Sequence, residues 1–229
     1  MDDPDACAEL WFEACGGKNN MPTPCNWKNV KGSRKYRLLH DPARAIEAEY
    51  VSPYELIDID ELVASGQKSV EHVLPKSFFK GKLGVCDPLG WVAADRDANT
   101  KRSNTPLVLW PLLNDAVPLR HYVPLFDQRG RLARKWLFMR CTYAPQIETP
   151  PTKAQAAHRH LILWMARRTQ ISEAEHEMNE WYAETLGWSN PLLSRDEAER
   201  DRFYDSPAFR ARVFGLAEIT TPPASSKEQ

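Results

Sequence analysis

The chain lacks the long hydrophobic run that a membrane-spanning helix needs. Its 229 residues are 42% hydrophobic, but no apolar run approaches the roughly 18–20 residues that cross a bilayer. The N-terminus, MDDPDACAELWFEACGG, is acidic and lacks the basic region and apolar core of a secretory signal. These absences predict a protein without a membrane anchor and favour a cytoplasmic location. A secreted or periplasmic location would require that a leader had been removed.

Cysteine is scarce and is not spaced as in common zinc sites. The chain has five cysteines, an odd number, so at least one thiol has no partner within the chain. Cys7, Cys15 and Cys25 cluster near the N-terminus without forming a C-x-x-C pair. This spacing favours reduced thiols, or one disulfide in an oxidising compartment, over a structural zinc ion.

Net charge is nearly absent, at −1, but the charges are unevenly distributed. Residues 27–44 and 118–140 each carry six basic residues against one acid, whereas residues 171–206 carry ten acids against three basic residues. Basic segments of this kind either meet a polyanion or form solvated surface, and both interpretations are open. In the first segment, the stretch RKYR makes Arg34 and Lys35 the candidates for phosphate contacts.

The composition is typical of one folded domain. Eight tryptophans and the apolar content indicate a globular protein, and 229 residues suffice for one sizeable core. No internal repeat is present, and only the tail TTPPASSKEQ has the composition of a disordered segment. We therefore predict a single globular domain with a disordered tail.

Short strands, loops and one short helix are predicted in the middle of the chain. The stretch SVEHVLPKSFF, residues 69–79, begins with β-branched and alternating apolar residues, which predict a strand that Pro75 ends. Asp95 can cap a short helix over residues 95–104, and Pro106 prevents its continuation.

The C-terminal third is predicted to be helical. Residues 151–168 should form a helix with an apolar stripe through Leu161, Trp164 and Met165. Three further helices carry start signals. These signals are a capping box at Ser172 and Glu175 with Gly187 at the far end, the same device at Ser194 and Glu197, and Pro207 directly after Ser206. Strands in the middle and helices behind them predict an α+β fold.

The dipeptide Glu71-His72 places a carboxylate and an imidazole at the end of an apolar strand, where burial costs free energy unless the groups are used. Phosphodiester hydrolysis needs a general base for water and a divalent ion that neutralises the phosphate and the leaving oxygen. His72 suits the first role, and Glu71 is a hard oxygen ligand suited to Mg²⁺. Asn99, inside the predicted short helix, offers a second oxygen. Each residue alone is equally compatible with an ordinary hydrogen-bonded position.

The sequence on both sides of these residues carries a longer pattern. VEHVLPKSFF is followed by DPLGWVAADRDANTKRSNTPL, then by RGRLARKWLFM, LILWMARRTQISEAEHEMNEWYAETLGWSNPLL and DSPAFRARVFG. This order resembles the endonuclease I family of His-Me finger (ββα-metal) nonspecific nucleases. That family has a Glu-His-x-x-Pro-x-Ser strand, an Asp-x-His-His/Asn-Leu-x-Pro-Ala-Asp segment, then Val-Asn-x-x-Arg-Ser-Asn and helical landmarks. The resemblance implies an α+β nuclease domain with a His-Me finger core at residues 69–215, a divergent segment at 1–68 packed on it, and a tail at 216–229.

The resemblance also implies residue roles. His72 would be the base that activates water, and Glu71 and Asn99 would hold a single Mg²⁺ or Mn²⁺ ion, which hard oxygen ligands prefer to Zn²⁺. Arg134 would stabilise developing charge in catalysis, and Arg102 would hold phosphate, since a guanidinium fork matches phosphate oxygens. Further candidates for backbone contacts are Lys76, Lys101 and Asn104. An ion pair on a helix surface is an equal alternative for Arg134.

The implied activity is endonucleolytic hydrolysis of DNA, with RNA as an alternative substrate, and with little sequence preference. Binding through phosphates would make the affinity strongly salt-dependent. Because an uncontrolled nonspecific nuclease is toxic in a cytoplasm, an inhibitor or regulatory protein is an expected partner.

The chain departs from the family pattern beside the predicted site. Leu89-Gly90-Trp91 stands where the family has His-His/Asn-Leu, and Ala93 replaces a proline. A polar side chain that would orient His72 is therefore missing, although a backbone carbonyl can fix an imidazole tautomer. Two alternatives stay open: a weakened homologue that binds nucleic acid without cutting it, and an interaction protein whose acidic C-terminal helices bind a partner.

Overall fold

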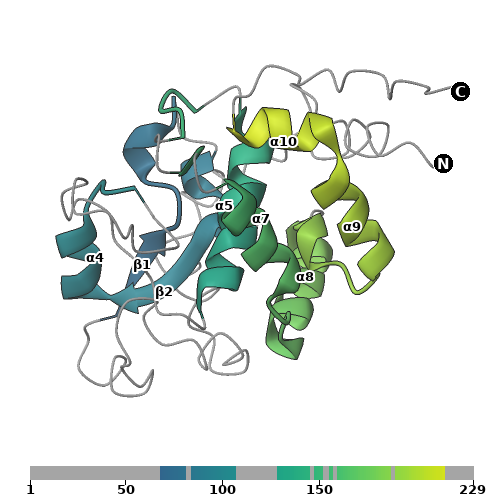
Figure 1. Ribbon diagram of the computed structural model, residues 1–229. Helices are drawn as coiled ribbons and strands as arrows, with labels where there is room; N and C mark the ends of the chain where they lie inside the picture. Colours follow the sequence, from purple (N-terminus) through teal and green to yellow (C-terminus); the bar gives the residue numbers. More distant parts are fainter. Residues whose placement is uncertain are drawn as a thin grey trace, which may run out of the picture.

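The computed structural model places short strands before a helical C-terminal part, so the α+β class is confirmed (Figure 1). The residues that it describes are 68–80, 84–106, 128–144, 147–151, 155–156, 159–186 and 189–214. The predictions for residues 1–67 and for the tail lie outside these residues. None of the described helices is long and apolar enough to cross a membrane.

A two-stranded antiparallel sheet lies at one end of the described structure. Strand β1 (Lys68–His72) pairs with β2 (Trp91–Asp95), with Glu71 opposite Val92. The predicted strand is thus confirmed, and it ends before Pro75. The 3₁₀ turns of the connection are η3 (Lys76–Phe78), η4 (Gly84–Cys86) and η5 (Pro88–Gly90).

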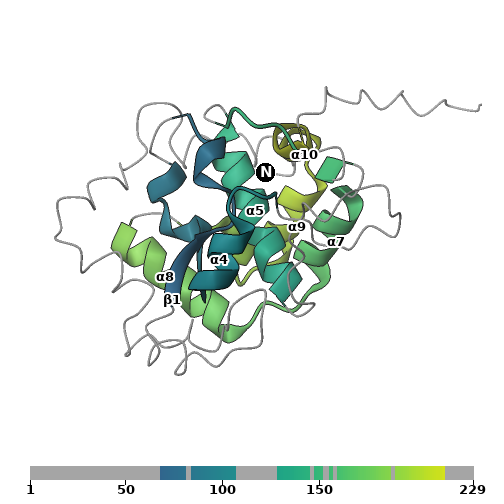
Figure 2. The same ribbon diagram turned by 90° about the vertical axis from the view of Figure 1, so that its left-hand side faces the viewer.

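Helix α4 (Arg96–Arg102) follows β2 directly and packs against both strands. Ala98 N donates to Asp95 Oδ1 at 2.8 Å, so the predicted cap is confirmed. The helix ends at Arg102; its C-terminal cap, Ser103, has a positive φ of 50°, and Pro106 follows. Figure 2 shows α4 and β1 together at this side of the molecule.

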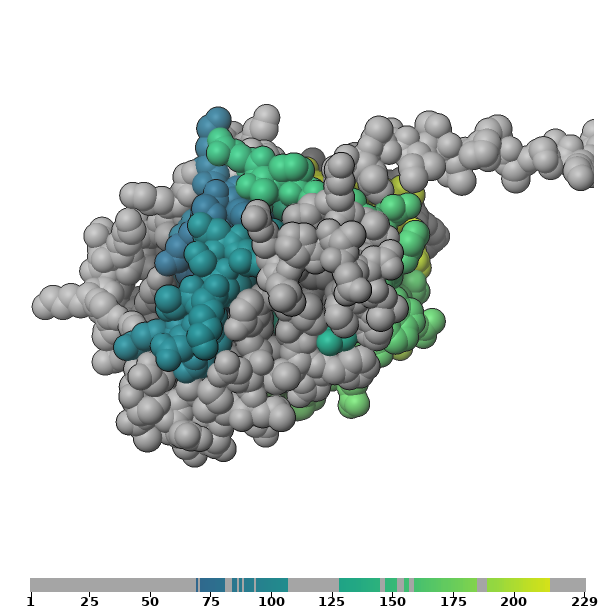
Figure 3. Space-filling model, turned by 60° about the vertical axis from the view of Figure 1, so that its left-hand side comes forward, coloured from purple at the N-terminus to yellow at the C-terminus, as the bar shows by residue number. Residues whose placement is uncertain are grey.

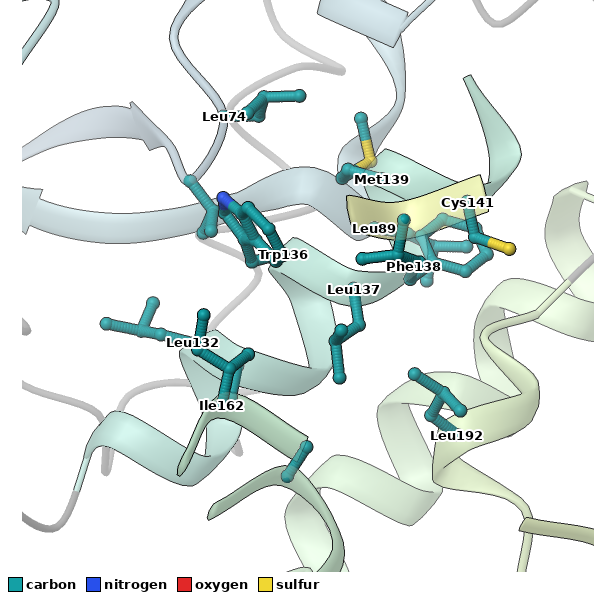
Figure 4. Close-up of a cluster of buried hydrophobic side chains, with 14 of the residues drawn as sticks. Leu74, Leu89, Leu132, Trp136, Leu137, Phe138, Met139, Cys141, Ile162 and Leu192 are labelled. Carbon is teal, nitrogen blue, oxygen red and sulfur yellow. The ribbon is translucent and has the colours of Figure 1, made fainter. Parts of the chain in front are cut away.

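Helix α5 (Arg129–Thr142) is the central element of the described fold. It is buried continuously from Gly130 to Cys141 and contacts η5, α7 and α10. Figure 4 shows the apolar side chains gathered around it, including Leu74 from the loop after β1, Leu89 from η5 and Leu192 from η8 (Pro191–Leu193). One hydrophobic core therefore joins the sheet end to the helical part.

Most basic side chains of α5 are not surface groups. Arg131, Arg134, Lys135 and Arg140 are buried, and burial lowers the pKa of Arg140 to about 10; Arg129, the first residue of the helix, is half-buried. These four buried residues therefore do not form the surface for a polyanion that was considered for residues 118–140.

The C-terminal helices begin largely as predicted. Helix α8 (Glu173–Leu186) opens with the expected capping box, since Glu175 N donates to Ser172 Oγ and Ser172 N to Glu175 Oε2, both at 3.2 Å. Helix α10 (Pro207–Phe214) has Pro207 at its first position. In Figure 1, α8 and α10 lie beyond α5, on the side away from the sheet.

Two details of these helices were predicted wrongly. In α7 (Arg159–Arg168) the buried face runs through Ile162, Met165 and Ala166, whereas Trp164, which belongs to the predicted stripe, is 55% exposed. In α9 (Glu197–Asp205) the cap is Asp196, whose Oδ1 accepts from Ala198 N. Aspartate is at least as good a cap as serine, and it lies one residue before the helix.

Candidate functional site

The Glu71 carboxylate is buried between β1 and α4. Residues two apart on a strand share a face, so Ser69 and Glu71 both point to the side that α4 covers. Glu71 is 1% exposed and forms an ion pair with Arg102 of α4, which is equally buried. The carboxylate therefore lies at the contact between the strand and the helix.

Arg102 joins the end of β1 to the end of α4. Its Nη1 donates to His72 O at 2.7 Å, its Nη2 to Val73 O at 3.0 Å, and its Nε to Thr105 O at 3.1 Å. The guanidinium is thus directed inward and satisfied by backbone carbonyls and by Glu71. Its contact with phosphate stays a prediction.

Asn99 lies one helical turn before Arg102, on the same side of α4. Its Nδ2 donates to Ser69 Oγ at 3.0 Å, and Ser69 Oγ donates to Ala94 O at 3.3 Å. The amide nitrogen of Asn99 is thus held in a hydrogen bond, so the atom of this side chain that could ligate an ion is Oδ1. The structure therefore brings Glu71 and Asn99 to the same strand–helix interface.

His72, the last residue of β1, lies on the opposite face of the strand. Its Nε2 is 3.0 Å from Val85 O, and the same carbonyl accepts from Trp91 Nε1 at 3.2 Å. The rings of His72 and Trp91 have centroids 5.7 Å apart, and His72 is 7% exposed. A carbonyl can only accept, so in the neutral ring Nε2 carries the proton and Nδ1 is the basic nitrogen.

The Val85 carbonyl thus supplies the backbone support that the sequence left open. Leu89 and Gly90 offer no polar side chain beside His72, and the loop before them turns its carbonyl toward the ring. The orientation of His72 is accounted for without the side chain that the family pattern has.

A second polar cluster, which the sequence did not single out, lies behind this loop. Asp87 is fully buried; its Oδ1 accepts from Leu89 N at 2.9 Å and its Oδ2 from Tyr143 OH at 2.7 Å. Burial raises the pKa of Asp87 to about 6, while both hydrogen bonds and the charge of Lys135 lower it. Asp87 opens the DPLG stretch, but no sequence signal pairs it with residues some fifty positions away.

Arg134 is held by the helical part of the molecule. Its Nη2 lies 2.8 Å from Glu175 Oε1 and 2.9 Å from Oε2, and its Nη1 donates to Ala166 O and Thr169 O. These partners belong to α7, to the turn after it and to α8, so the structure gives Arg134 a buried ion pair there. Its part in catalysis stays a prediction.

The remaining residues predicted to contact nucleic acid are exposed where the structure describes them. Lys76, Lys101 and Asn104 are exposed at η3 and around the end of α4. Figure 3 shows the segment from β1 to α4, blue to teal, reaching the surface on one face. Arg34 and Lys35 lie outside the described residues.

The donor set fits a hard cation in kind. Among the described residues no group of three or more His, Cys, Asp or Glu side chains gathers as a metal site, but the predicted set is one carboxylate and one amide. Glu71 has two oxygens and about four lone-pair directions, so it can accept a hydrogen bond from Arg102 and ligate an ion at the same time. Hydrogen bonds to ligating carboxylates are usual around bound metals.

No protein-family model matches the chain, and no curated protein matches it either. The interpretation of the site therefore depends on its own geometry.

Proposed function

We propose that the chain is a metal-dependent endonuclease that hydrolyses phosphodiester bonds of DNA, with RNA as an alternative substrate, and with little sequence preference. The observation that carries the proposal is the strand–strand–helix unit formed by β1, β2 and α4. In this unit His72, whose ring is held by Val85 O, lies at a strand end, and Glu71 and Asn99, the candidate oxygen ligands, lie where that strand meets the helix. A His-Me finger core has this order of parts.

His72 would act as the general base. Its Nδ1 accepts a proton from water, while the Nε2 hydrogen bond to Val85 O fixes the plane of the ring and stabilises the imidazolium that forms. A positioned base of this kind typically contributes about 10²–10⁴ to the rate.

Glu71 and Asn99 would hold Mg²⁺ or Mn²⁺. When bound, the ion supplies positive charge to the nonbridging phosphate oxygen and to the leaving 3′ oxygen. Arg102 holds the Glu71 carboxylate in place, and Ser69 holds the Asn99 amide. The exposed Lys76 and Lys101 can contact the nucleic-acid backbone without reading bases.

The test is nicking of supercoiled plasmid in the presence of Mg²⁺. We expect the wild-type protein to nick the plasmid, EDTA to stop the reaction, and His72→Ala to slow it by about a hundredfold or more. His160→Ala is the matched control, because His160 is an exposed histidine on α7, and it should cleave at the wild-type rate. The proposal fails if wild type is inactive with both Mg²⁺ and Mn²⁺, or if His72→Ala is as active as wild type.

One observation favours a second function, binding of nucleic acid without cleavage. Arg102 already supplies a cation to the buried Glu71 carboxylate, and a metal ion would have to share that carboxylate. Gel-shift measurements at low salt in EDTA distinguish the two functions. Binding without any cleavage in Mg²⁺ or Mn²⁺ would select the second.

A further inference from the structure

We infer that Asp87 is a positioning residue for His72: together with Tyr143 and Lys135 it holds the loop whose Val85 carbonyl orients the imidazole. The catalytic meaning of this arrangement rests on the proposed function. The arrangement itself is a property of the fold and is tested without substrate.

Asp87 closes its own loop through both backbone and side chain. Asp87 N donates to Gly84 O at 3.4 Å, and Gly90 N donates to Asp87 O at 3.1 Å. The side chain adds the bond from Leu89 N to Oδ1. Residues 84–90 therefore fold around Asp87, with Val85 inside the loop.

Two side chains from the α5 region attach this loop to the core. Tyr143, at the end of α5, donates its hydroxyl to Asp87 Oδ2 at 2.7 Å, and Lys135 Nζ donates to Leu89 O at 3.1 Å. Tyr143 and Lys135 are both buried. Burying the Asp87 carboxylate and the Lys135 ammonium costs free energy that burying apolar side chains would not cost. In this structure the two groups hold the path of the loop.

The loop position decides where the Val85 carbonyl points. That carbonyl accepts hydrogen bonds from both His72 Nε2 and Trp91 Nε1. Its position must therefore suit two rings at once, one from β1 and one from β2. Val73 N donates to Gly90 O at 3.0 Å and ties the other end of the loop to the same pair. Without the contact of Asp87 to Tyr143, the loop keeps its strand attachment and the Lys135 bond to Leu89 O, but it loses one of its two side-chain attachments to the α5 region.

The readout is the Nε2 proton of His72 in heteronuclear NMR. In the wild-type protein at pH 8, we expect a resolved Nε2–H correlation whose exchange with water is slow, because the proton is hydrogen-bonded and buried. In Tyr143→Phe, which removes one hydroxyl and keeps the ring, exchange should accelerate by about tenfold through local opening of the loop. Asp87→Asn should accelerate it at least as much.

His176 is an internal control in every sample. Its Nδ1 bonds to Leu193 O at 2.9 Å on the far side of α5, so its Nδ1–H correlation should exchange as in wild type. The inference is overturned if the His72 proton exchanges at the wild-type rate in both variants, or if the His72 and His176 protons accelerate equally. Inactivity of the protein on nucleic acid would overturn the proposed function and leave this result unchanged.

Discussion

At the scale of single residues, the two neighbours Glu71 and His72 have different environments because a strand sends successive side chains to opposite faces. Glu71 meets Arg102 of α4, and His72 meets the Val85 carbonyl and the Trp91 ring. The strand end thus separates a carboxylate that has a cationic partner from an imidazole that has a fixed tautomer.

The raised pKa of Asp87 makes the stability of the protein pH-dependent. Burial lifts this pKa from 3.8 to about 6 in the folded state. Between these values the folded protein binds more protons than the unfolded chain, so the free energy of unfolding falls as the pH rises from about 4 to about 6. The expected contribution is about 3 kcal/mol.

Urea denaturation of wild type and Asp87→Asn at a series of pH values measures this contribution. The free energy of unfolding of wild type minus that of Asp87→Asn should decrease between about pH 4 and about pH 6 and level off above pH 6, because asparagine does not titrate. Parallel curves between pH 4 and pH 7 would contradict the assigned environment of Asp87.

The sequence could single out those candidate residues that belong to a local pattern. Glu71, His72 and Asn99 became candidates because a strand end and a capped helix are visible in the sequence, and the structure places these three residues on β1 and α4. The inward roles of Arg102 and Arg134 were not visible. A guanidinium that bonds backbone carbonyls leaves no signature in the residues that provide them.

At the scale of elements, two of the three predicted side-chain caps were correct, and helix faces were less predictable. Asp95 and the Ser172 box act through neighbours in sequence, and both start the helices that they predicted. Trp164 shows the limit, because its exposure depends on which neighbouring elements approach α7. Propensity and spacing do not contain that information.

Glycine at position 90 has a packing reason. A Cβ at this position would lie 2.6 Å from Met139 Sδ and 2.8 Å from Met139 Cε, so η5 can approach α5 because residue 90 is glycine. We expect Gly90→Ala to lower the free energy of unfolding by about 1–3 kcal/mol through overpacking.

Truncating Met139 provides the control for this prediction. In a Met139→Ala background, itself destabilised by the cavity, Gly90→Ala should cost almost nothing, because the clashing atoms are absent. Urea denaturation of the four proteins gives the coupling. An equal cost of Gly90→Ala in both backgrounds would show that Met139 is not the obstacle.

At the scale of the whole molecule, the charged residues that the structure describes are not separated in space as they are along the sequence. Four basic residues of α5 are buried, and one of them, Arg134, pairs with Glu175 of the acidic segment. Other acids of the C-terminal helices have exposed basic partners, such as Glu173 and Glu180 with Arg195, and Asp205 with Arg167. Many of these charges therefore lie in ion pairs rather than on two opposed surfaces.

The buried pair of Arg134 and Glu175 joins α5 to α8 across the centre of the molecule, and it provides the last prediction. Removing one partner leaves the other charge buried without its counter-ion, which typically costs about 3–5 kcal/mol. We therefore expect Arg134→Met and Glu175→Gln each to lower the free energy of unfolding strongly. Glutamine keeps the capping geometry with Ser172, so the loss reports the charge.

The double variant distinguishes an ion pair from two independent contributions. With both charges removed, the loss should be smaller than the sum of the single losses by about 1–3 kcal/mol, as measured by urea denaturation under one set of conditions. Arg195→Met is the matched control, because its ion pairs with Glu173 and Glu180 are solvent-exposed and screened, and it should change stability far less. Additive losses in the double variant would show that Arg134 stabilises the fold through Ala166 O and Thr169 O rather than through Glu175.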